Sequence, residues 1–510
     1  MTLRTFPVVL GVLVLTVGCS APDSGEPASP SPAATSFPTQ PARILIDGDG
    51  TDWADLPPRH TDPAGDGQTL DLGTLWMAHD DEHLFVRVEV GDTLNLQEGN
   101  DLTLYLDTDA NAQTGLSAQG LGAEVTWTFG ERQGRVVRRG DTMDIRHDDL
   151  GFASLPTVRS SVFEVALRRT AAPGGSALFP GDSLRVALSG GGDRAPNADT
   201  GIGYAFSAAA LPDLEAPTVG RTAAPSLRLL SYNLQRDRFF DAAPQPSYAR
   251  LLTAVAPDVA GFQEVYDHSA DETLAVFTDL YGAETDATWQ AAKAGLDLVL
   301  VSRYPIEATH TIPGSEDNRS GAFLLDTRDA LGTRLLYVLA HPPCCNYDDA
   351  TPSRDAQRQR VVDAIAAFLR DVKAGEGPFD VPANTPIVVA GDMNFVGAAR
   401  QPNTLRTGDI ANNGAFGPDA APDWDGSPLL DTNPRQVGTP LHVTWDDPGS
   451  SFPPGRLDYT YVSDSVLEVV NAYVLHTPAL PDAVRAAHGL DADDTRRASD
   501  HLPLVVDVVA

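Results

Sequence analysis

Hydrophobic and polar positions alternate along residues 42–211 in the way that is typical of half-buried β-strands. Residues 84–90 read Leu-Phe-Val-Arg-Val-Glu-Val, and similar short stretches follow at residues 102–106, 125–129 and 161–167. Successive side chains of a strand point to opposite faces, so a period of two indicates one face in a core and one in water. Turns rich in Gly, Asp and Asn separate these stretches. The pattern predicts an antiparallel β-sandwich over residues 42–211.

The pattern changes after residue 226, where short apolar strands begin to alternate with amphipathic helices. We expect strands at residues 228–232, 259–262, 298–301, 335–340 and 387–390. A helix between the last two strands carries Val361, Ile365, Phe368 and Leu369 on one face. This mixed order predicts an α/β domain with layered sheets over residues 226–510. Residues 212–225 contain three prolines and are expected to link the two domains.

The first residues of the chain are typical of an export signal. Residues 8–18 form an apolar run that is too short to span a bilayer, and small residues precede Cys19. Residues 1–19 therefore resemble a lipoprotein signal peptide with lipidation at Cys19, or else an ordinary secretory signal with an incidental cysteine. Residues 20–41, rich in Pro, Ser, Ala and Thr, predict a flexible tether. We expect a lipoprotein that contacts the membrane only through its anchor, or a secreted protein.

The chain is strongly acidic, with a formal charge of −34 and only two lysines, Lys293 and Lys373. Such a composition fits a protein that works in concentrated salt, or an acidic secreted protein that repulsion keeps soluble. An acidic surface repels a long polyanion unless salt screens it, and at about 1 M salt the Debye length is only about 3 Å. The sequence contains no basic stripe typical of a nucleic-acid binder.

Cys344 and Cys345 are the only cysteines besides Cys19. Because they are adjacent, they cannot link distant parts of the fold. In an exported protein they could close a vicinal disulfide, and the alternative is two free buried thiols. A zinc site is not expected, since further cysteine ligands are absent from the sequence.

Polar residues stand at the ends of the expected strands of the second domain, where a rigid sheet can hold them in a fixed geometry. Taken singly, an Asn or Asp after a strand is more often a turn former. Turn formation alone does not explain six polar sites that follow one another along the chain, each at the boundary of an expected strand. They lie in the segments SYNLQ, GFQEV, LAHPP, VAGDMN, RLDYTYVS and SDHLP.

These six segments, taken in order, resemble the endonuclease/exonuclease/phosphatase superfamily, and the resemblance extends over residues 227–507. It implies a four-layer α/β sandwich of the deoxyribonuclease-like type. It also implies hydrolysis of a phosphoester by an activated water, with Mg²⁺ or Mn²⁺ as the cofactor. A hard cation of this kind prefers oxygen ligands. By the same resemblance, Glu264 is expected to bind the metal with Asn233 beside it, and Asp500 to contact the metal or a water.

The catalytic residues that the resemblance implies are His341, Asp392, Asn394, Asp458 and His501. Asp392 and Asn394 match the pair that orients the attacking water and holds the phosphate. His501 matches the histidine that contacts the scissile phosphate or takes a proton, and Asp458 matches the carboxylate that orients it. His341 is expected to protonate the leaving group, which favours the deoxyribonuclease, sphingomyelinase and inositol phosphatase branches over abasic-site endonucleases.

The first domain resembles sandwich modules related to family-nine carbohydrate-binding modules. The resemblance rests on three features: the segment Ile46-Asp-Gly-Asp-Gly with Trp53, the pair of expected strands around Leu84 and Leu104, and the loop that contains Asp107, Asp109 and Asn111. It implies a calcium site formed by this loop with Glu124, and contact with a carbohydrate surface. The alternative is an ordinary turn rich in turn-forming residues.

Together these features predict an exported, monomeric, metal-dependent phosphoesterase. An extracellular nuclease is the leading reading, so nucleic acid is the first substrate to consider. A phosphodiesterase or phosphatase acting on a phospholipid or a small molecule is the alternative. A non-catalytic cell-surface binding protein is the third, and it is disfavoured because every expected catalytic position is filled.

Overall fold

The computed structural model describes residues 37–138, 140–212, 214, 216–222, 226–282, 285–314, 317–345 and 353–510. The expected signal at residues 1–19, with Cys19, and most of the tether lie outside the described residues. The described residues from Phe37 to Ala510 belong to one compact unit. The boundary expected between two domains at residues 212–225 therefore stays a prediction. Among the described residues, no helix is long and apolar enough to cross a membrane.

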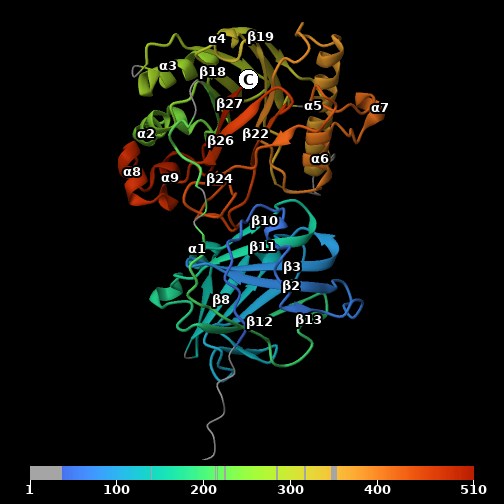
Figure 1. Ribbon diagram of the computed structural model, residues 1–510, viewed down its shortest axis with the longest axis vertical. Helices are drawn as coiled ribbons and strands as arrows, with labels where there is room; N and C mark the ends of the chain where they lie inside the picture. Colours follow the sequence, from blue (N-terminus) through green and yellow to red (C-terminus); the bar gives the residue numbers. More distant parts are fainter. Residues whose placement is uncertain are drawn as a thin grey trace, which may run out of the picture. The chain divides into compact units, whose positions relative to one another are not determined.

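The residues before Pro212, called here the N-terminal β domain, form two main antiparallel sheets (Figure 1). One sheet has the order β1 (His60–Thr61), β2 (Leu72–His79), β3 (His83–Leu94), β11 (Ser160–Arg168) and β10 (Ala153–Leu155). The other has the order β13 (Asp193–Ala195), β12 (Ser183–Gly190), β4 (Thr103–Asp107), β7 (Val125–Thr128), β8 (Gln133–Arg138) and β9 (Asp141–Ile145), and β14 (Ile202–Ala205) pairs with β12. The two sheets share one core, to which Met77, Val88, Leu104, Trp127 and Val186 contribute.

The residues from Leu227 onward, called here the catalytic domain, contain two mixed sheets. The first has the order β17 (Gln290–Ala294), β18 (Leu298–Ser302), β16 (Val259–Gln263), β15 (Leu227–Asn233), β27 (Leu504–Val509), β26 (Glu468–Val474) and β24 (Arg435–Gln436). The second has the order β19 (Ile306–Thr311), β20 (Ser320–Leu325), β21 (Leu335–Ala340), β22 (Ile387–Asp392), β25 (Asp458–Val462) and β23 (Leu430–Asp431).

These sheets and the helices form layers, and three main apolar cores among the described residues hold them together. Residues such as Leu229, Leu300, Tyr337 and Val388 join the two sheets face to face. Helices α2 (Gln245–Val255) and α3 (Ala270–Leu280) cover the outer face of the first sheet. Helix α5 (Arg354–Ala374) covers the second, and Figure 1 shows it on the opposite side of the sheets from α2 and α3. The α/β layering predicted from the hydrophobic pattern is confirmed.

Strand pairing brings the polar strand ends to one edge of the two sheets. Asn233 at the end of β15 lies opposite Gln263 at the end of parallel β16. Asp392 at the end of β22 lies opposite Asp458, the first residue of antiparallel β25. Apolar strands fix this register because a shift by one residue would turn buried side chains to the other face.

Candidate active site

Glu264 follows directly after β16 and takes a backbone conformation that is uncommon for a residue other than glycine. Its φ is 63°, in the left-handed region. Its N–H donates to Oδ2 of Asp297 over 3.1 Å. The Nδ2 of Asn233 donates to Oε1 of Glu264 and to Oδ2 of Asp392, both over 3.0 Å. The Oδ1 of Asn233 accepts from the N–H of Gln235. Asn233 therefore turns its amide nitrogen, rather than its oxygen, toward the two carboxylates.

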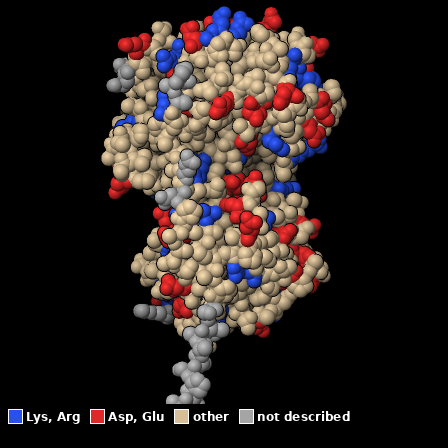
Figure 2. All heavy atoms as spheres, viewed as in Figure 1, with Lys and Arg blue, Asp and Glu red and all other residues tan. Residues whose placement is uncertain are grey.

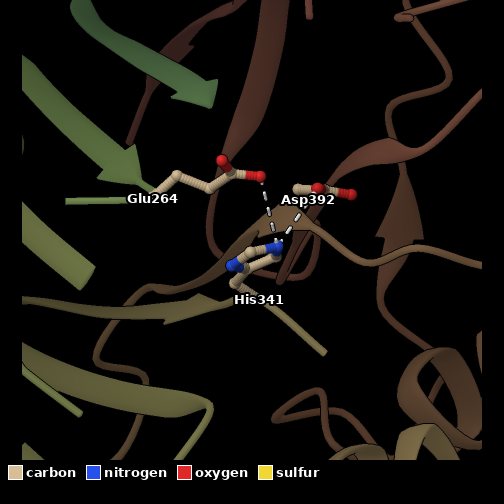
Figure 3. A group of neighbouring side chains, drawn as sticks. All are labelled: Glu264, His341 and Asp392. Carbon is tan, nitrogen blue, oxygen red and sulfur yellow. Dashed lines mark ion pairs between the residues drawn. The ribbon is translucent and has the colours of Figure 1, made fainter. Parts of the chain in front are cut away.

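His341 directly follows β21 and lies between a buried aspartate and the two carboxylates just described. Its Nδ1 is 2.5 Å from Oδ2 of Asp297. Its Nε2 is 3.4 Å from Oδ2 of Asp392 and 3.9 Å from Oε1 of Glu264 (Figure 3). Burial by itself would lower the pKa of His341, but the charges of Asp297, Asp392 and Glu264 outweigh burial and raise it to about 9. His341 is therefore cationic at neutral pH.

Asp297 is a member of this site that sequence reasoning did not identify. It is fully buried, immediately before β18. Burial favours its neutral form, but the charge of His341 and the hydrogen bond to it prevail and lower the pKa of Asp297. A signal was present in the sequence, because Asp297 borders an apolar strand in the same way as the predicted site residues do.

His501 forms a second pair of the same type. Its Nδ1 is 2.9 Å from Oδ2 of Asp458, and its Nε2 is 3.6 Å from Oδ2 of Asp392. Although burial favours the neutral ring, the charges of Asp458 and Asp392 raise the pKa of His501 well above its ordinary value. Two histidines, each held by its own aspartate, thus face one carboxylate from two sides.

Asp392 is the carboxylate on which both histidines converge. Its Oδ2 accepts from Nδ2 of Asn394 over 3.0 Å, and this amide also donates to the carbonyl of Pro342. Burial raises the pKa of Asp392 to about 6, although the two imidazolium charges act in the opposite direction. Asn394 has a φ of 49°, and its own N–H donates to Oδ1 of Asp392. Its amide is therefore fixed at the carboxylate.

The donor set fits a hard divalent cation. The carboxylates of Glu264 and Asp392, and those of Asp392 and Asp458, have oxygens within 4.8 Å of each other. His341 and His501 lie in the same two groups, but as cations they have no lone pair to offer a metal. Burying several carboxylates together is costly unless a positive charge compensates them. Oδ1 of Asp458 is buried and has no hydrogen-bond partner among the described residues. Carboxylate oxygens are the ligands that Mg²⁺ prefers.

Asp500 lies in the same cavity but outside these two groups. Its Oδ2 accepts from Nε1 of Trp445 over 3.1 Å, and its Oδ1 accepts from Oγ of Ser499 over 3.4 Å. The roles expected for Asn233 and Asp500 at the metal stay predictions.

The site opens into a cavity of about 360 Å³. Arg319 and Arg354, which sequence reasoning left out of the site, are among its lining residues. Cys344 and Cys345 also line it, as free cysteines whose sulfur atoms lie 2.7 Å apart. The disulfide considered for this pair stays a prediction.

The N-terminal β domain contains the acidic cluster that the sequence predicts. Asp107, Asp109 and Glu124 each offer an oxygen within 4.8 Å of the others. Burial raises the pKa of Asp107 to about 6, and Oε1 of Glu124 is buried without a hydrogen-bond partner in the described part of the chain. Asn111 is not in the group, and its backbone N–H donates to both aspartates. A second group, which sequence reasoning missed, contains Asp62, Asp66 and Asp193.

Histidine–aspartate pairs and carboxylates at one sheet edge of a layered α/β domain are consistent with a metal-dependent phosphoester hydrolase. The sequence model of the Endonuclease/Exonuclease/phosphatase family matches residues 230–501. The chain belongs to this family, whose members hydrolyse phosphoester bonds and typically depend on a divalent metal. No curated protein matches the chain.

Several solved structures are similar to the catalytic domain. Sphingomyelinase C from Streptomyces griseocarneus is 20% identical, with 56% of this chain and 99% of that one covered at a TM-score of 0.32. TDP2 from D. rerio, in complex with a single-strand DNA product, is 16% identical, with 56% and 99% covered at a TM-score of 0.34. A family protein from Leptotrichia buccalis is 14% identical, with 55% and 99% covered at a TM-score of 0.36.

Proposed function

We propose that the protein hydrolyses phosphodiester or phosphomonoester bonds with an activated water and a divalent cation, Mg²⁺ or Mn²⁺. The observation that supports this most is the convergence of two histidine–aspartate pairs on Asp392, with Glu264 across from them. Cationic imidazoles and a cation-binding carboxylate at one point suit a phosphoryl group, which is itself an anion.

The cation would be held by Glu264 and Asp392, with Asp500 as a further predicted contact. Asn233, which is also predicted there, faces both carboxylates with its amide nitrogen and would support them rather than bind the cation. When bound, such a cation polarises a phosphoryl oxygen and fixes the orientation of the substrate. Asn233 donates hydrogen bonds to both carboxylates and so keeps their oxygens at a fixed separation.

The protonation states of the other side chains determine which of them acts as base, which contacts the phosphate and which acts as acid. Asp392, with a pKa of about 6, is ionised at neutral pH and can take the proton of the attacking water. Asn394 holds that carboxylate in place through its amide nitrogen. His501, kept cationic by Asp458, contacts the phosphate. His341, kept cationic by Asp297, donates its Nε2 proton to the leaving oxygen.

The test is hydrolysis of bis(4-nitrophenyl) phosphate by the full chain with Mg²⁺, then with chelator, and then with Mg²⁺ restored. Activity should follow the metal, and Glu264→Gln and His501→Ala should each abolish it. Asp279→Asn is a matched control, because Asp279 is exposed on α3. Metal-dependent turnover that survives either of the first two substitutions would refute the site.

Substrate and location extend this proposal. We place the protein outside the cytoplasm, anchored at Cys19 or secreted, on the strength of its first residues. The extracellular nuclease remains the reading that the sequence favours, with the phospholipid or small-molecule esterase as its alternative. Plasmid DNA, RNA, sphingomyelin vesicles and bis(4-nitrophenyl) phosphate, compared at low and high salt, separate these classes, because salt screening affects polyanions most.

The N-terminal β domain is proposed to bind calcium at Asp107, Asp109 and Glu124. The unsatisfied buried oxygen of Glu124 supports this assignment, because a cation would provide the partner that it lacks. Contact of this domain with a carbohydrate surface is a further proposal, which retention on immobilised polysaccharide would test.

A further inference from the structure

We propose that the N-terminal β domain forms one wall of the active-site cavity and that Gln97 selects a soluble phosphoester of about nucleotide size with a polar organic group. This inference rests on the proposed function, since it assigns the substrate class of the same site. Its starting point is the lining of the catalytic cavity, which includes Asn95, Gln97 and Thr157 from the N-terminal β domain.

The loop that carries Gln97 is fixed on both sides of that residue. The N–H of Gln97 donates to Oδ1 of Asn95 over 3.0 Å, while Nδ2 of Asn95 donates to the carbonyl of Val396 in the catalytic domain over 3.2 Å. The carbonyl of Gln97 accepts from Nη1 of Arg132 over 2.6 Å. The guanidinium of Arg132 in turn lies 4.1 Å from the ring centre of Phe452, which also lines the cavity. Asn95 and Arg132 are therefore positioning residues for Gln97.

A second contact, at Thr157, fixes the same wall. Its Oγ1 donates to the carbonyls of Phe395 and Arg456 over 2.8 and 3.0 Å. A Cβ atom at Gly455 would lie only 2.7 Å from Cγ2 of Thr157, so the segments that contain these two residues pack so closely that only glycine fits at position 455. Rigid walls hold a side chain in place for recognition at little cost in entropy.

The side chain of Gln97 is available for a ligand. It is half-buried in the lining of the cavity, and its amide makes no hydrogen bond with any residue that the structure describes. A carboxamide offers both donors and acceptors, so it can bind hydroxyl, carbonyl or ring nitrogen groups. The neighbouring surface of Val396, Phe452 and Pro453 is apolar. This combination suits a nucleoside or a sugar esterified to the phosphate.

The size and charge of the cavity limit the substrate further. Its volume of about 360 Å³ is near the lower end of the range of about 300–1,000 Å³ for small-molecule sites. A double helix or a bilayer surface is much wider than such a cavity. Figure 2 shows acidic and basic side chains interspersed on the face in view, and the chain carries a charge of −34, which repels polyanions in dilute buffer. Arg319 and Arg354 offer positive charge within the cavity itself.

The experiment compares two chromogenic probes with the full chain and Mg²⁺. Thymidine 5′-phosphate 4-nitrophenyl ester has a polar organic group, and 4-nitrophenyl phenylphosphonate has an apolar one. The wild type should prefer the nucleotidyl probe at least tenfold in kcat/KM. Gln97→Ala should raise its KM about tenfold and reduce the preference accordingly, because a hydrogen-bonding contact is lost. Gln97→Glu should raise KM more, because it places a negative charge beside an anionic substrate.

Gln133→Ala is the matched control, since Gln133 is an exposed amide of the same domain in β8 and lies outside the cavity lining. Equal unfolding midpoints would show that all the variants fold. Failure of the wild type to hydrolyse either probe would overturn the proposed function and this inference together. Turnover of both probes with an unchanged KM in Gln97→Ala would overturn this inference alone. So would faster turnover of plasmid DNA or sphingomyelin vesicles than of the nucleotidyl probe.

Discussion

Replacing Asp297 by asparagine tests how the site controls the proton on His341. The substitution keeps the size of the side chain and removes its charge at the 2.5 Å contact with Nδ1. Asp297 is fully buried, so water cannot replace the lost charge. We expect the imidazole to lose its proton more easily and the leaving group to be protonated more slowly.

The magnitude follows from the pKa of His341, which the surrounding charges raise from 6.5 to about 9. That difference of about 2.5 units corresponds to ~3.4 kcal/mol at 1.36 kcal/mol per unit. Asp297 makes the largest charge contribution, ahead of Asp392 and Glu264. Because burial acts in the opposite direction, the charges together supply more than this net difference, and loss of the Asp297 charge should lower the pKa of His341 by about 1–2 units. Above the lowered pKa, where the ring has lost its proton, the absence of the general acid reduces the rate by up to about 10²–10⁴.

The sign of the pH dependence can be stated for activity and for stability. His341 acts as an acid, so kcat/KM falls above its pKa, and Asp297→Asn should move that basic limb to lower pH. For folding, a pKa raised to about 9 gives stability that is fully present below pH 6.5 and is lost as the pH rises through 9. The variant should lose less stability over the same interval.

The assay is a pH–rate profile with bis(4-nitrophenyl) phosphate at saturating Mg²⁺, together with urea unfolding at pH 6 and pH 9. Asp279→Asn makes the same change in charge at an exposed position on α3 and should behave as wild type. A profile of Asp297→Asn that keeps both its basic limb and its height within threefold would refute the reasoning.

Three further predictions concern groups in other parts of the chain. Arg228 and Asp507 form a buried ion pair with contacts of 2.6 and 2.7 Å, so Arg228→Met alone should lower the free energy of unfolding in urea by about 3–5 kcal/mol. Adding Asp507→Leu should restore most of this loss, and a double variant whose loss equals the sum of the two single losses would contradict the prediction. Ca²⁺ should raise the Tm of the wild type but not that of Glu124→Gln, and equal shifts in thermal unfolding would exclude a site there. Burial raises the pKa of Asp392 to about 6, so its ionisation lowers the stability of the fold as the pH rises from 3.8 through 6. Without metal, Asp392→Asn should therefore be about 1–3 kcal/mol more stable than the wild type at pH 7, although inactive. A lower stability of this variant in urea unfolding would contradict the prediction.

The sequence predicted most of the fold of the catalytic domain because its strands are short apolar runs buried on both faces. The expected strand at residues 335–340 is β21, and the one at residues 387–390 is the start of β22. The apolar positions of residues 248–255 also predict a helix, and α2 begins earlier than this pattern, at Gln245. The pattern does not reveal the first turn because that turn contains Pro246 and little apolar surface. The residues at strand ends were predictable for the same reason, since the strands end where the buried runs end.

Asp297 shows where reasoning from the sequence stopped. Its partner His341 is 44 positions away and in the other sheet. The contact depends on the antiparallel pairing of β16 with β18 and on the packing of the two sheets, neither of which follows from local periodicity. A single aspartate before a strand also fits a turn, so its role appears only when the sheets are assembled.

Substrate selection was less accessible still, because it depends on loops rather than on strands. The wall around Gln97 is held by contacts such as Thr157 with Phe395 and Arg132 with Phe452, each between residues that are more than 200 positions apart. No periodic pattern connects such loops, whereas each catalytic residue is attached to a strand whose burial the sequence reveals. The chemistry of the site and its choice of substrate therefore have different structural origins: the sheet edge fixes the reacting groups, and the contact between the two domains determines what can reach them.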